Sequence, residues 1–185
     1  MNLGATPGDG ATEFLVWAPE AKRVDVALVA PDRRVVPMQE QDEGHWSARV
    51  EGIGVGARYM YRLDGVELPD PASRFQPEGV RGPSEVVDAS PLDLGRWRGL
   101  PFRDVVFYEV HVGTFSRAGT FDGVTERLPY LKDLGATALE IMPVAQFSGS
   151  RNWGYDGVFP FAVQNSYGGP AGLRRPRAPP SRGGA

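Results

Sequence analysis

The middle of the chain contains two apolar runs, Asp104-Val-Val-Phe-Tyr-Glu-Val-His-Val112 and Thr137-Ala-Leu-Glu-Ile-Met142. The first run is typical of a strand in a sheet that is covered on both faces, and the second is predicted to be the next strand. The residues between the runs include apolar side chains at helical spacing, namely Val124, Leu128, Leu131 and Leu134. A strand, a helix and a second strand in this order predict a βαβ unit, which requires a parallel sheet.

Local signals mark the predicted helix. Asp122 is expected to cap its first turn, and Gly135 is expected to end it. Pro129 lies inside the segment and should kink the helix or restart it. A closed barrel of eight βα units takes about 250 residues. Residues 104–173 are therefore expected to form only the start of a (β/α)8 barrel, which remains incomplete.

The first 88 residues have a different pattern. Short runs of β-branched and aromatic residues alternate with turns; these runs are Phe14–Ala18, Val24–Val29, Trp46–Val50 and Arg58–Leu63. Such spacing without a helical period predicts a small β-sandwich over residues 1–88. Residues 89–103 contain prolines and glycines without periodicity, which predicts a linker or a clasp between domains that Trp97 packs against the protein.

The composition limits the classes of partner. The 185 residues carry a net charge of −3 at pH 7, which gives no general attraction to nucleic acid or anionic membranes. The absence of cysteine excludes disulfides, thiolate metal sites and a cysteine nucleophile. The N-terminus lacks signal-peptide features, and no apolar run approaches the about 20 residues of a membrane helix. We therefore expect a cytoplasmic protein with no nucleic-acid partner, membrane partner, metal or other cofactor.

Residues 174–185 differ from the rest of the chain, because they contain four arginines, three prolines, no acidic residue and no large apolar residue. The preceding segment Gly169–Leu173 resembles the first turn of a further helix, which the prolines from Pro176 onward would forbid. This break predicts a frameshift or an error in the gene model near Leu173. The alternative is a natural basic tail, and RNA binding is disfavoured because no aromatic residue is present to stack on bases.

Two carboxylates and a histidine lie on the predicted parallel strands. Glu109 and His111 alternate with Val105 and Phe107, so that they share one face of the first strand, and Glu140 lies on the second. These side chains could orient a site inside a barrel, but a hydrogen-bonded pair in the core is favoured for Glu109 and His111. Glu140 is also interpreted as structural, with His111 or an arginine as the partner that a buried carboxylate requires.

The loop Ser148-Gly-Ser-Arg-Asn-Trp-Gly-Tyr-Asp-Gly157 follows the second strand, where α/β barrels place their sites. It brings together Asn152, Trp153, Tyr155 and Asp156. Aromatic rings stack on the apolar faces of sugars, whereas amides and carboxylates hold hydroxyl groups. The loop therefore indicates sugar binding, with structural anchoring by its two aromatic residues as the alternative.

Motifs of other enzyme classes are missing from the sequence. It contains no glycine-rich phosphate-binding loop and no GxSxG nucleophile elbow, and its two histidines lack metal-ligand spacing. No two carboxylates can be assigned as a catalytic acid and base.

Several segments together resemble the start of an α-amylase-superfamily barrel: Phe107–Phe115, Gly119–Gly123, Leu128–Gly135, Leu139–Val144 and Asn152–Gly157. The stretch 152–170 is similar to that of the malto-oligosyltrehalose trehalohydrolase family, and glycogen branching enzymes fit it less well. Upstream, residues 14–19 and 68–87 resemble the immunoglobulin-like N-terminal domain of that family. The resemblance spans residues 12–173 in order.

The resemblance implies a retaining glycoside hydrolase that cleaves the α-1,4 bond joining a maltooligosaccharide to its terminal trehalose. Such enzymes use two carboxylates about 5 Å apart, a nucleophile and a proton donor, which in the family come from strands beyond residue 185. Tyr155 matches the family's tyrosine that stacks under the sugar, with Asn152, Trp153 and Asp156 as its neighbours. We therefore expect a maltooligosaccharide-type substrate, no catalytic residue in this chain and no hydrolysis by the 185 residues alone.

Three alternatives stay open at this point. The chain could be a relative of glycogen or starch branching enzymes, which only resemblance separates from trehalohydrolases. The sandwich could bind α-glucans without catalysis through Trp17, Trp46 and Tyr61, although core packing is favoured for each of them. The chain could also be an interaction fragment, completed by a second chain that carries the rest of the barrel.

Overall fold

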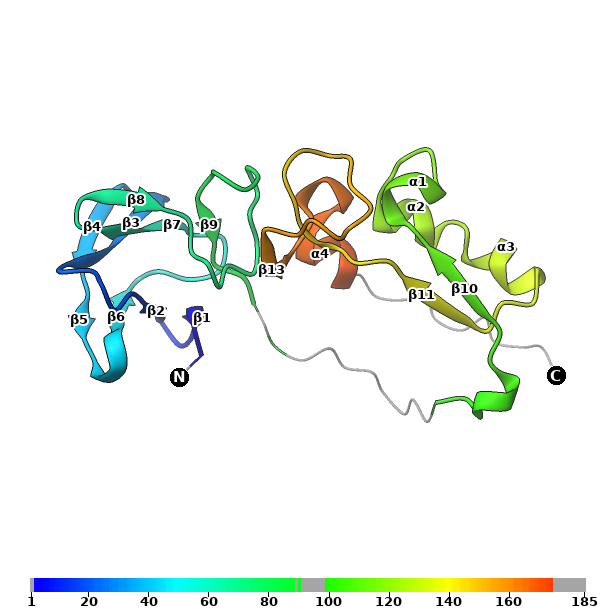
Figure 1. Ribbon diagram of the computed structural model, residues 1–185, viewed down its shortest axis with the longest axis horizontal. Coiled ribbons are helices and arrows are strands. Elements are labelled where there is room, and N and C mark those ends of the chain that lie inside the picture. Colours follow the sequence, from blue (N-terminus) through cyan, green and yellow to red (C-terminus); the bar gives the residue numbers. More distant parts are fainter. Residues whose placement is uncertain (1, 89, 91–98, 175–185) are drawn as a thin grey trace.

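The computed structural model describes residues 2–88, 90 and 99–174. It has a β-rich part with β1 to β9 and a mixed part with α1 to α4 and β10 to β13 (Figure 1). In the described part of the chain, no helix is long and apolar enough to cross a membrane. The predicted packing of Trp97, most of the predicted linker and residues 175–185 lie outside the described residues.

The first part is a two-layer antiparallel β-sandwich, as predicted. One sheet has the order β1-β2-β6-β5, and the other has the order β4-β3-β7-β8 with β9 beside β7. The elements are β1 (Gly4–Pro7), β2 (Ala11–Trp17), β3 (Val24–Ala30), β4 (Arg34–Pro37), β5 (Gln39–Glu40), the 3-10 turn η1 (Asp42–Gly44), β6 (His45–Glu51), β7 (Arg58–Leu63), β8 (Val66–Leu68) and β9 (Ser84–Glu85).

The sandwich core lies between the two sheets and is rich in aromatic residues. Tyr59 and Tyr61 alternate along β7 with less buried residues and pack edge to face, with ring centroids 5.7 Å apart. Trp46 and Tyr61 are buried in this core, which confirms the favoured interpretation for both. The same interpretation is wrong for Trp17, which is 59% exposed and whose Nε1 donates to the carbonyl oxygen of Glu43 at 3.0 Å.

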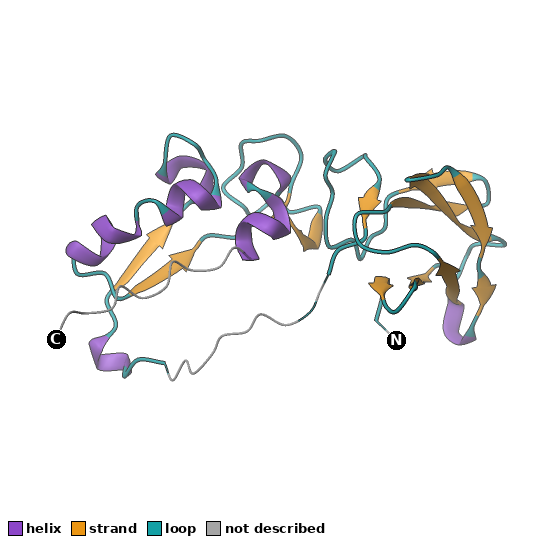
Figure 2. Ribbon diagram, turned by 180° about the vertical axis from the view of Figure 1, so that it is seen from behind, coloured by secondary structure: helices purple, strands orange, loops and turns teal. Residues whose placement is uncertain are grey.

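The second part begins with the predicted βαβ unit, in which β10 and β11 pair in parallel. Helices α1, α2 and α3 lie on one side of this pair (Figure 2). The elements are η2 (Phe102–Asp104), β10 (Phe107–Val110), α1 (Val112–Phe115), α2 (Phe121–Thr125), α3 (Leu128–Asp133), β11 (Ala138–Ile141), β12 (Ala145–Gln146), β13 (Phe159–Val163), η3 (Asn165–Tyr167) and α4 (Gly169–Arg174). The short β12 and β13 pair in antiparallel orientation.

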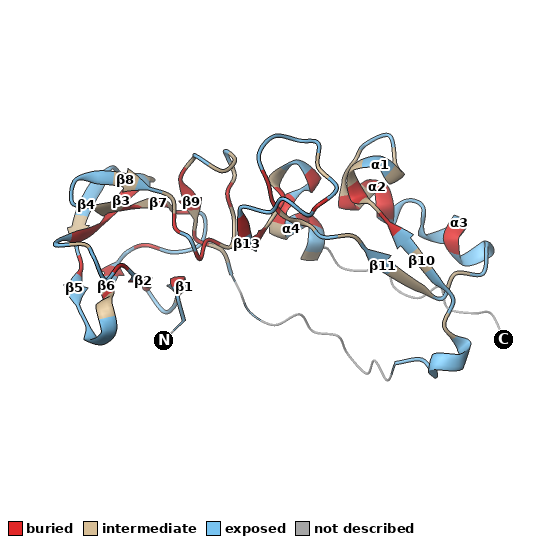
Figure 3. Ribbon diagram, in the orientation of Figure 1, coloured by how far each residue is buried: buried red, intermediate tan, exposed pale blue. Residues whose placement is uncertain are grey.

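The first parallel strand is shorter than predicted and is not covered on both faces. Phe107 is 58% exposed and Glu109 is also exposed, so the face that they share is open (Figure 3). His111 lies outside the strand, because the chain turns into α1 after Val110 and His111 becomes its N-cap residue. The apolar run 104–112 therefore indicates a strand correctly but overstates its length and its burial.

The helix signals are partly confirmed. Pro129 restarts the helix, because it lies in the first turn of α3 after α2 has ended. Gly135 follows α3 with a φ of +97°, the left-handed conformation that glycine adopts without strain. The prediction for Asp122 is wrong: the N-cap residue of α2 is Thr120, whose side chain accepts a hydrogen bond from the Gly123 amide.

The two parts meet through the segment between β8 and β9. The Asn165 side-chain Nδ2 donates to the carbonyl oxygen of Pro77 at 3.1 Å. Gly169, at the start of α4, lies so close to the ring of Phe75 that a Cβ atom would approach it to 2.6 Å. The segment from η3 to α4, at the end of the barrel part, is thus packed against residues that connect two strands of the sandwich.

Candidate functional site

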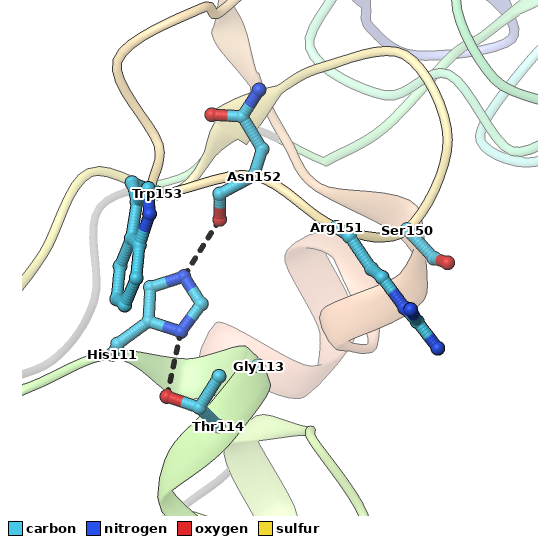
Figure 4. Close-up of a pocket in the computed structure, with 7 residues that line it drawn as sticks. All are labelled: His111, Gly113, Thr114, Ser150, Arg151, Asn152 and Trp153. Atoms are coloured by element: carbon cyan, nitrogen blue, oxygen red, sulfur yellow. Dashed lines mark hydrogen bonds between the residues drawn. The ribbon is translucent and has the colours of Figure 1, made fainter.

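A cavity of about 390 Å³ opens between the end of β10 and the loop 148–157. Its lining comes from two segments (Figure 4), and the residues are His111, Gly113, Thr114, Ser150, Arg151, Asn152 and Trp153. One segment directly follows β10, and the other follows β11 by way of the short β12. Both segments therefore lie beyond the carboxyl ends of parallel strands, where α/β barrels carry their sites.

The four predicted binding residues fall into two groups. Asn152 and Trp153 line the cavity, whereas Tyr155 and Asp156 lie in the same loop but outside that lining. Trp153 is 66% exposed and Tyr155 is 72% exposed. Both rings thus offer wide free faces to solvent, which is what stacking on a sugar requires and what a buried loop anchor would lack.

The loop is held by its own polar groups. Asn152 Oδ1 accepts a hydrogen bond from the Gly154 amide at 2.7 Å, and Asn152 Nδ2 donates to Asp156 Oδ2 at 3.1 Å. Gly154 has a φ of +98°, and a Cβ atom there would lie 2.2 Å from the carbonyl oxygen of Pro143. A glycine is therefore required for the turn that separates Trp153 from Tyr155.

The predicted pairing of Glu109 with His111 is wrong, and so is the predicted burial of Glu140. Both carboxylates are exposed and need no buried partner. His111 Nδ1 instead bonds to Thr114 Oγ1 at 3.0 Å, and His111 Nε2 bonds to the carbonyl oxygen of Asn152 at 2.7 Å. The histidine therefore belongs to the cavity and is not part of a carboxylate pair.

Two buried glutamines support the loop, and sequence reasoning missed this role. Gln164 Oε1 accepts from the Phe147 amide at 2.9 Å, and its Nε2 donates to the Gly149 carbonyl oxygen at 2.9 Å. Gln146 Oε1 accepts from the Asn165 amide at 2.9 Å. The available signal was a glutamine at the end of the short apolar stretch 143–146 and another directly after the stretch 158–163, because a polar side chain in such a position must be hydrogen-bonded if it is buried.

The lining of the cavity offers aromatic, cationic and hydrogen-bonding groups. Its lining includes the cation Arg151, the indole of Trp153 and the imidazole of His111, but no carboxylate. Within residues 2–88, 90 and 99–174, no group of three or more His, Cys, Asp or Glu residues is arranged to hold a metal ion. The lining can contact apolar faces and hydroxyl groups, but it does not supply the two facing carboxylates of a glycosidase.

The chain combines a β-sandwich, the start of an α/β barrel and exposed aromatic rings beyond the parallel strands. Comparison with known families gives the class of protein, which is carbohydrate-active. Residues 2–79 match the model of carbohydrate-binding module 48 (isoamylase N-terminal domain), and residues 83–175 match that of the alpha amylase catalytic domain. The chain belongs to the alpha-amylase family.

Two curated relatives show which enzymes of this family the chain is similar to. The chain is 47% identical to malto-oligosyltrehalose trehalohydrolase of Saccharolobus solfataricus, over 95% of this chain and 31% of that protein. It is 36% identical to 1,4-alpha-glucan branching enzyme GlgB of Burkholderia cenocepacia, over 94% of this chain and 28% of that protein. The chain therefore spans about 30% of the length of these curated relatives.

Solved structures agree with this assignment. A crystal structure of an alpha amylase candidate from Salmonella typhimurium has a TM-score of 0.85 and 40% identity, and the match covers 93% of this chain and 30% of that one. A pullulanase from Anoxybacillus sp. LM18-11, solved with maltotetraose, has a TM-score of 0.74 and 27% identity. That match covers 90% of this chain and 30% of the pullulanase.

Proposed function

We propose that this chain is part of a glycoside hydrolase that acts on α-1,4-glucosidic bonds and releases trehalose from maltooligosyltrehalose, a step in trehalose biosynthesis. Within such an enzyme, the loop 148–157 holds the substrate through Tyr155, Trp153, Asn152 and Asp156. The observation that carries the proposal is the exposure of the Trp153 and Tyr155 rings in a loop beyond the parallel strands. The 47% sequence identity to a malto-oligosyltrehalose trehalohydrolase, which extends over 95% of this chain, supports it.

The proposal assigns a separate role to each segment of the chain. Residues 1–88 form the sandwich domain, residues 89–103 the linker and residues 104–173 the barrel segment that contributes the binding loop. The lining of the cavity contains no carboxylate. We therefore expect the 185-residue chain to bind α-glucans but to release no trehalose. As a separate part of the proposal, we expect the protein in the cytoplasm.

Binding can be measured by isothermal titration of the 185-residue chain with maltoheptaose and with a trehalose-terminated maltooligosaccharide. Stacking one ring face removes about 50 Å² from water, which at about 25 cal/mol per Å² is about 1.3 kcal/mol, or roughly tenfold in affinity. Trp153→Ala and Tyr155→Ala should each weaken binding by about that factor. Tyr130→Ala is the matched control, because Tyr130 is an exposed tyrosine on α3 that does not line the cavity.

The two ligands separate the candidate enzymes. Tighter binding of the trehalose-terminated ligand supports a trehalohydrolase, whereas equal binding of both favours the branching-enzyme relative. Absence of binding at millimolar concentrations of either sugar would refute the assignment of this loop as a substrate site.

A second candidate function rests on Trp17. Its indole is exposed on the sandwich and held by the hydrogen bond to Glu43, so that a flat, fixed aromatic face is available. The indole also borders an apolar groove shared with Phe161 of β13. A chain that binds α-glucans through the sandwich should lose affinity on Trp17→Ala substitution and keep it on Trp153→Ala substitution, which is the reverse of the first candidate.

A further inference from the structure

One side chain, His111, joins three segments that are distant in the sequence. Its Nδ1 bonds to Thr114 Oγ1 within the first turn of α1. Its Nε2 bonds to the carbonyl oxygen of Asn152, 41 residues away in the binding loop, and lies 3.2 Å from the hydroxyl oxygen of Tyr167 in η3. The imidazole is therefore the point where the end of β10, the loop and the helical end of the chain meet.

The partners of His111 define which nitrogen carries the proton. A carbonyl oxygen can only accept, so Nε2 must donate its hydrogen to Asn152. In the neutral imidazole Nδ1 is then an acceptor, and it receives the hydroxyl hydrogen of Thr114. Thr114 thereby favours the tautomer that can hold the loop, as the outer partner of a histidine does in metal sites.

The imidazole also positions an aromatic ring. The ring centroids of His111 and Trp153 are 5.2 Å apart, with planes inclined by 59°, and the two rings lie side by side in Figure 4. His111 also meets the buried Tyr167 edge to face, with centroids 6.1 Å apart. Tyr167 in turn packs against Phe147 in the core of this part. The exposed indole is thus connected to the core through the histidine.

The space around the imidazole is restricted. A Cβ atom at Gly113 would lie 3.1 Å from His111 Cε1 and 3.0 Å from Tyr167 Cε1. Such distances are tighter than ordinary van der Waals contact, so that a side chain at position 113 would displace one of the two rings. A glycine here permits the close approach of histidine, tyrosine and loop.

We propose that His111 is a positioning residue for α-glucan binding. Its Nε2–H holds the Asn152 carbonyl and, through it, the orientation of the Trp153 indole on which a glucosyl ring stacks. The identity of the ligand rests on the proposed function above, whereas the ordering of the loop by His111 does not. The role belongs to the histidine's donor at Nε2 and makes no use of His111 as an acid or base.

The test compares two substitutions that each keep one nitrogen position. Glutamine at position 111 can place an amide N–H near the Nε2 position, whereas asparagine reaches only the Nδ1 position. In the full 185-residue chain labelled with ¹⁵N, the heteronuclear NOE of residues 150–156 reports the order of the loop without ligand. The indole N–H signal of Trp153, assigned by its loss in Trp153→Phe, reports maltoheptaose binding. The indole signal of the buried Trp46 verifies that the sandwich is folded, and the amide signals of Phe121 and Val124 verify that the core of the second part is intact.

We expect His111→Asn to lower the NOE of residues 150–156 and to weaken maltoheptaose binding by about tenfold, the effect of about 1.4 kcal/mol. His111→Gln should stay within about threefold of the unsubstituted chain. Thr114→Val removes the donor that selects the tautomer and should weaken binding by an intermediate factor with the Trp46 signal unchanged.

Each other outcome has a defined meaning. Unchanged NOE values and affinity in His111→Asn overturn the proposal, and equal losses in the asparagine and glutamine variants overturn the role of the Nε2 donor. An unaffected Thr114→Val variant overturns the tautomer argument, also in the case that the His111 variants fail to fold. If maltoheptaose shifts no signal but His111→Asn still loosens the loop, the proposed function fails and the positioning role stands.

Discussion

Replacing Tyr59 by phenylalanine removes a single oxygen atom from the centre of the sandwich. The Tyr59 hydroxyl donates to Asp70 Oδ2 at 2.6 Å, and both residues are almost completely buried. Asp70 also accepts a hydrogen bond from the Ala72 amide at 2.8 Å and donates its own amide hydrogen to Ser84 Oγ. The pair therefore ties β7 to the segment that carries the contact with the barrel part.

The expected magnitude follows from the charge on the acceptor. A hydrogen bond to a charged group contributes about 1.5–3 kcal/mol, whereas a neutral one contributes about 0.5–1.5 kcal/mol. Tyr59→Phe should therefore lower the free energy of unfolding by about 2–3 kcal/mol at pH 7. The matched control is Tyr61→Phe, because the Tyr61 hydroxyl in the same core donates to the neutral carbonyl oxygen of Leu15 at 3.3 Å and should cost about 1 kcal/mol or less.

The pH dependence adds a second test. Burial raises the pKa of Asp70, and the hydrogen bond from Tyr59 opposes this rise. Between the ordinary aspartate pKa of about 3.9 and the raised value, the folded state binds more protons, so stability increases as the pH falls. In Tyr59→Phe the opposing hydrogen bond is gone, so the pKa of Asp70 is higher than in the wild type and the variant gains more stability as the pH falls. The difference in unfolding free energy between wild type and Tyr59→Phe should therefore shrink from pH 7 toward pH 4.

Urea denaturation measures both effects if it is followed by the indole N–H signal of Trp46, which is buried in the sandwich core. The unfolding free energies of wild type, Tyr59→Phe and Tyr61→Phe are compared at neutral and acidic pH. Equal losses in the two variants at pH 7, or a Tyr59→Phe loss that does not change with pH, would refute the argument that Asp70 is an ionised acceptor at neutral pH.

Two further perturbations test the charge and loop arguments. Burial would raise the pKa of Asp25, but hydrogen bonds from Arg23 and Arg62 outweigh it and lower the pKa. This interaction stabilises the fold at pH values above the ordinary aspartate pKa and is lost as the pH falls through the lowered pKa of Asp25. Arg62→Met should therefore lower the melting temperature at pH 7, and thermal melts should show a weaker fall of the melting temperature in acid. Gly154→Ala should abolish maltoheptaose binding in a titration, because its Cβ would strike a backbone carbonyl. Gly149→Ala is the control: it has a φ of +78° in open space, costs about 1–2 kcal/mol of backbone strain and should keep binding.

Local patterns were sufficient where one element determines the outcome. The alternation of Tyr59 and Tyr61 indicates a strand with one buried face, and β7 has that face. Pro129 and Gly135 mark where α3 begins and where the chain leaves it, because their backbone preferences depend on no distant residue. The aromatic loop after the second parallel strand was also evident, although its role in binding is still a prediction.

The sequence could not decide which tryptophan is buried. In the β2–β6 pair, Val16 lies opposite Trp46 and Trp17 lies opposite His45. Neighbouring residues of a strand point to opposite faces, so this register turns Trp46 inward together with Val16 and turns Trp17 outward. Two similar aromatic residues thus have opposite roles, and only the strand pairing assigns them.

The composition and periodicity of the chain were enough to define a sandwich followed by a βαβ unit, because turns, helix ends and strand alternation are local properties. The tertiary structure decided what covers each face and which distant groups meet. Glu109 is exposed although its strand is apolar, and His111 bonds to the Asn152 carbonyl across 41 residues. Burial and hydrogen bonding of this kind depend on partners brought together by folding, so no window of sequence around either residue contains them.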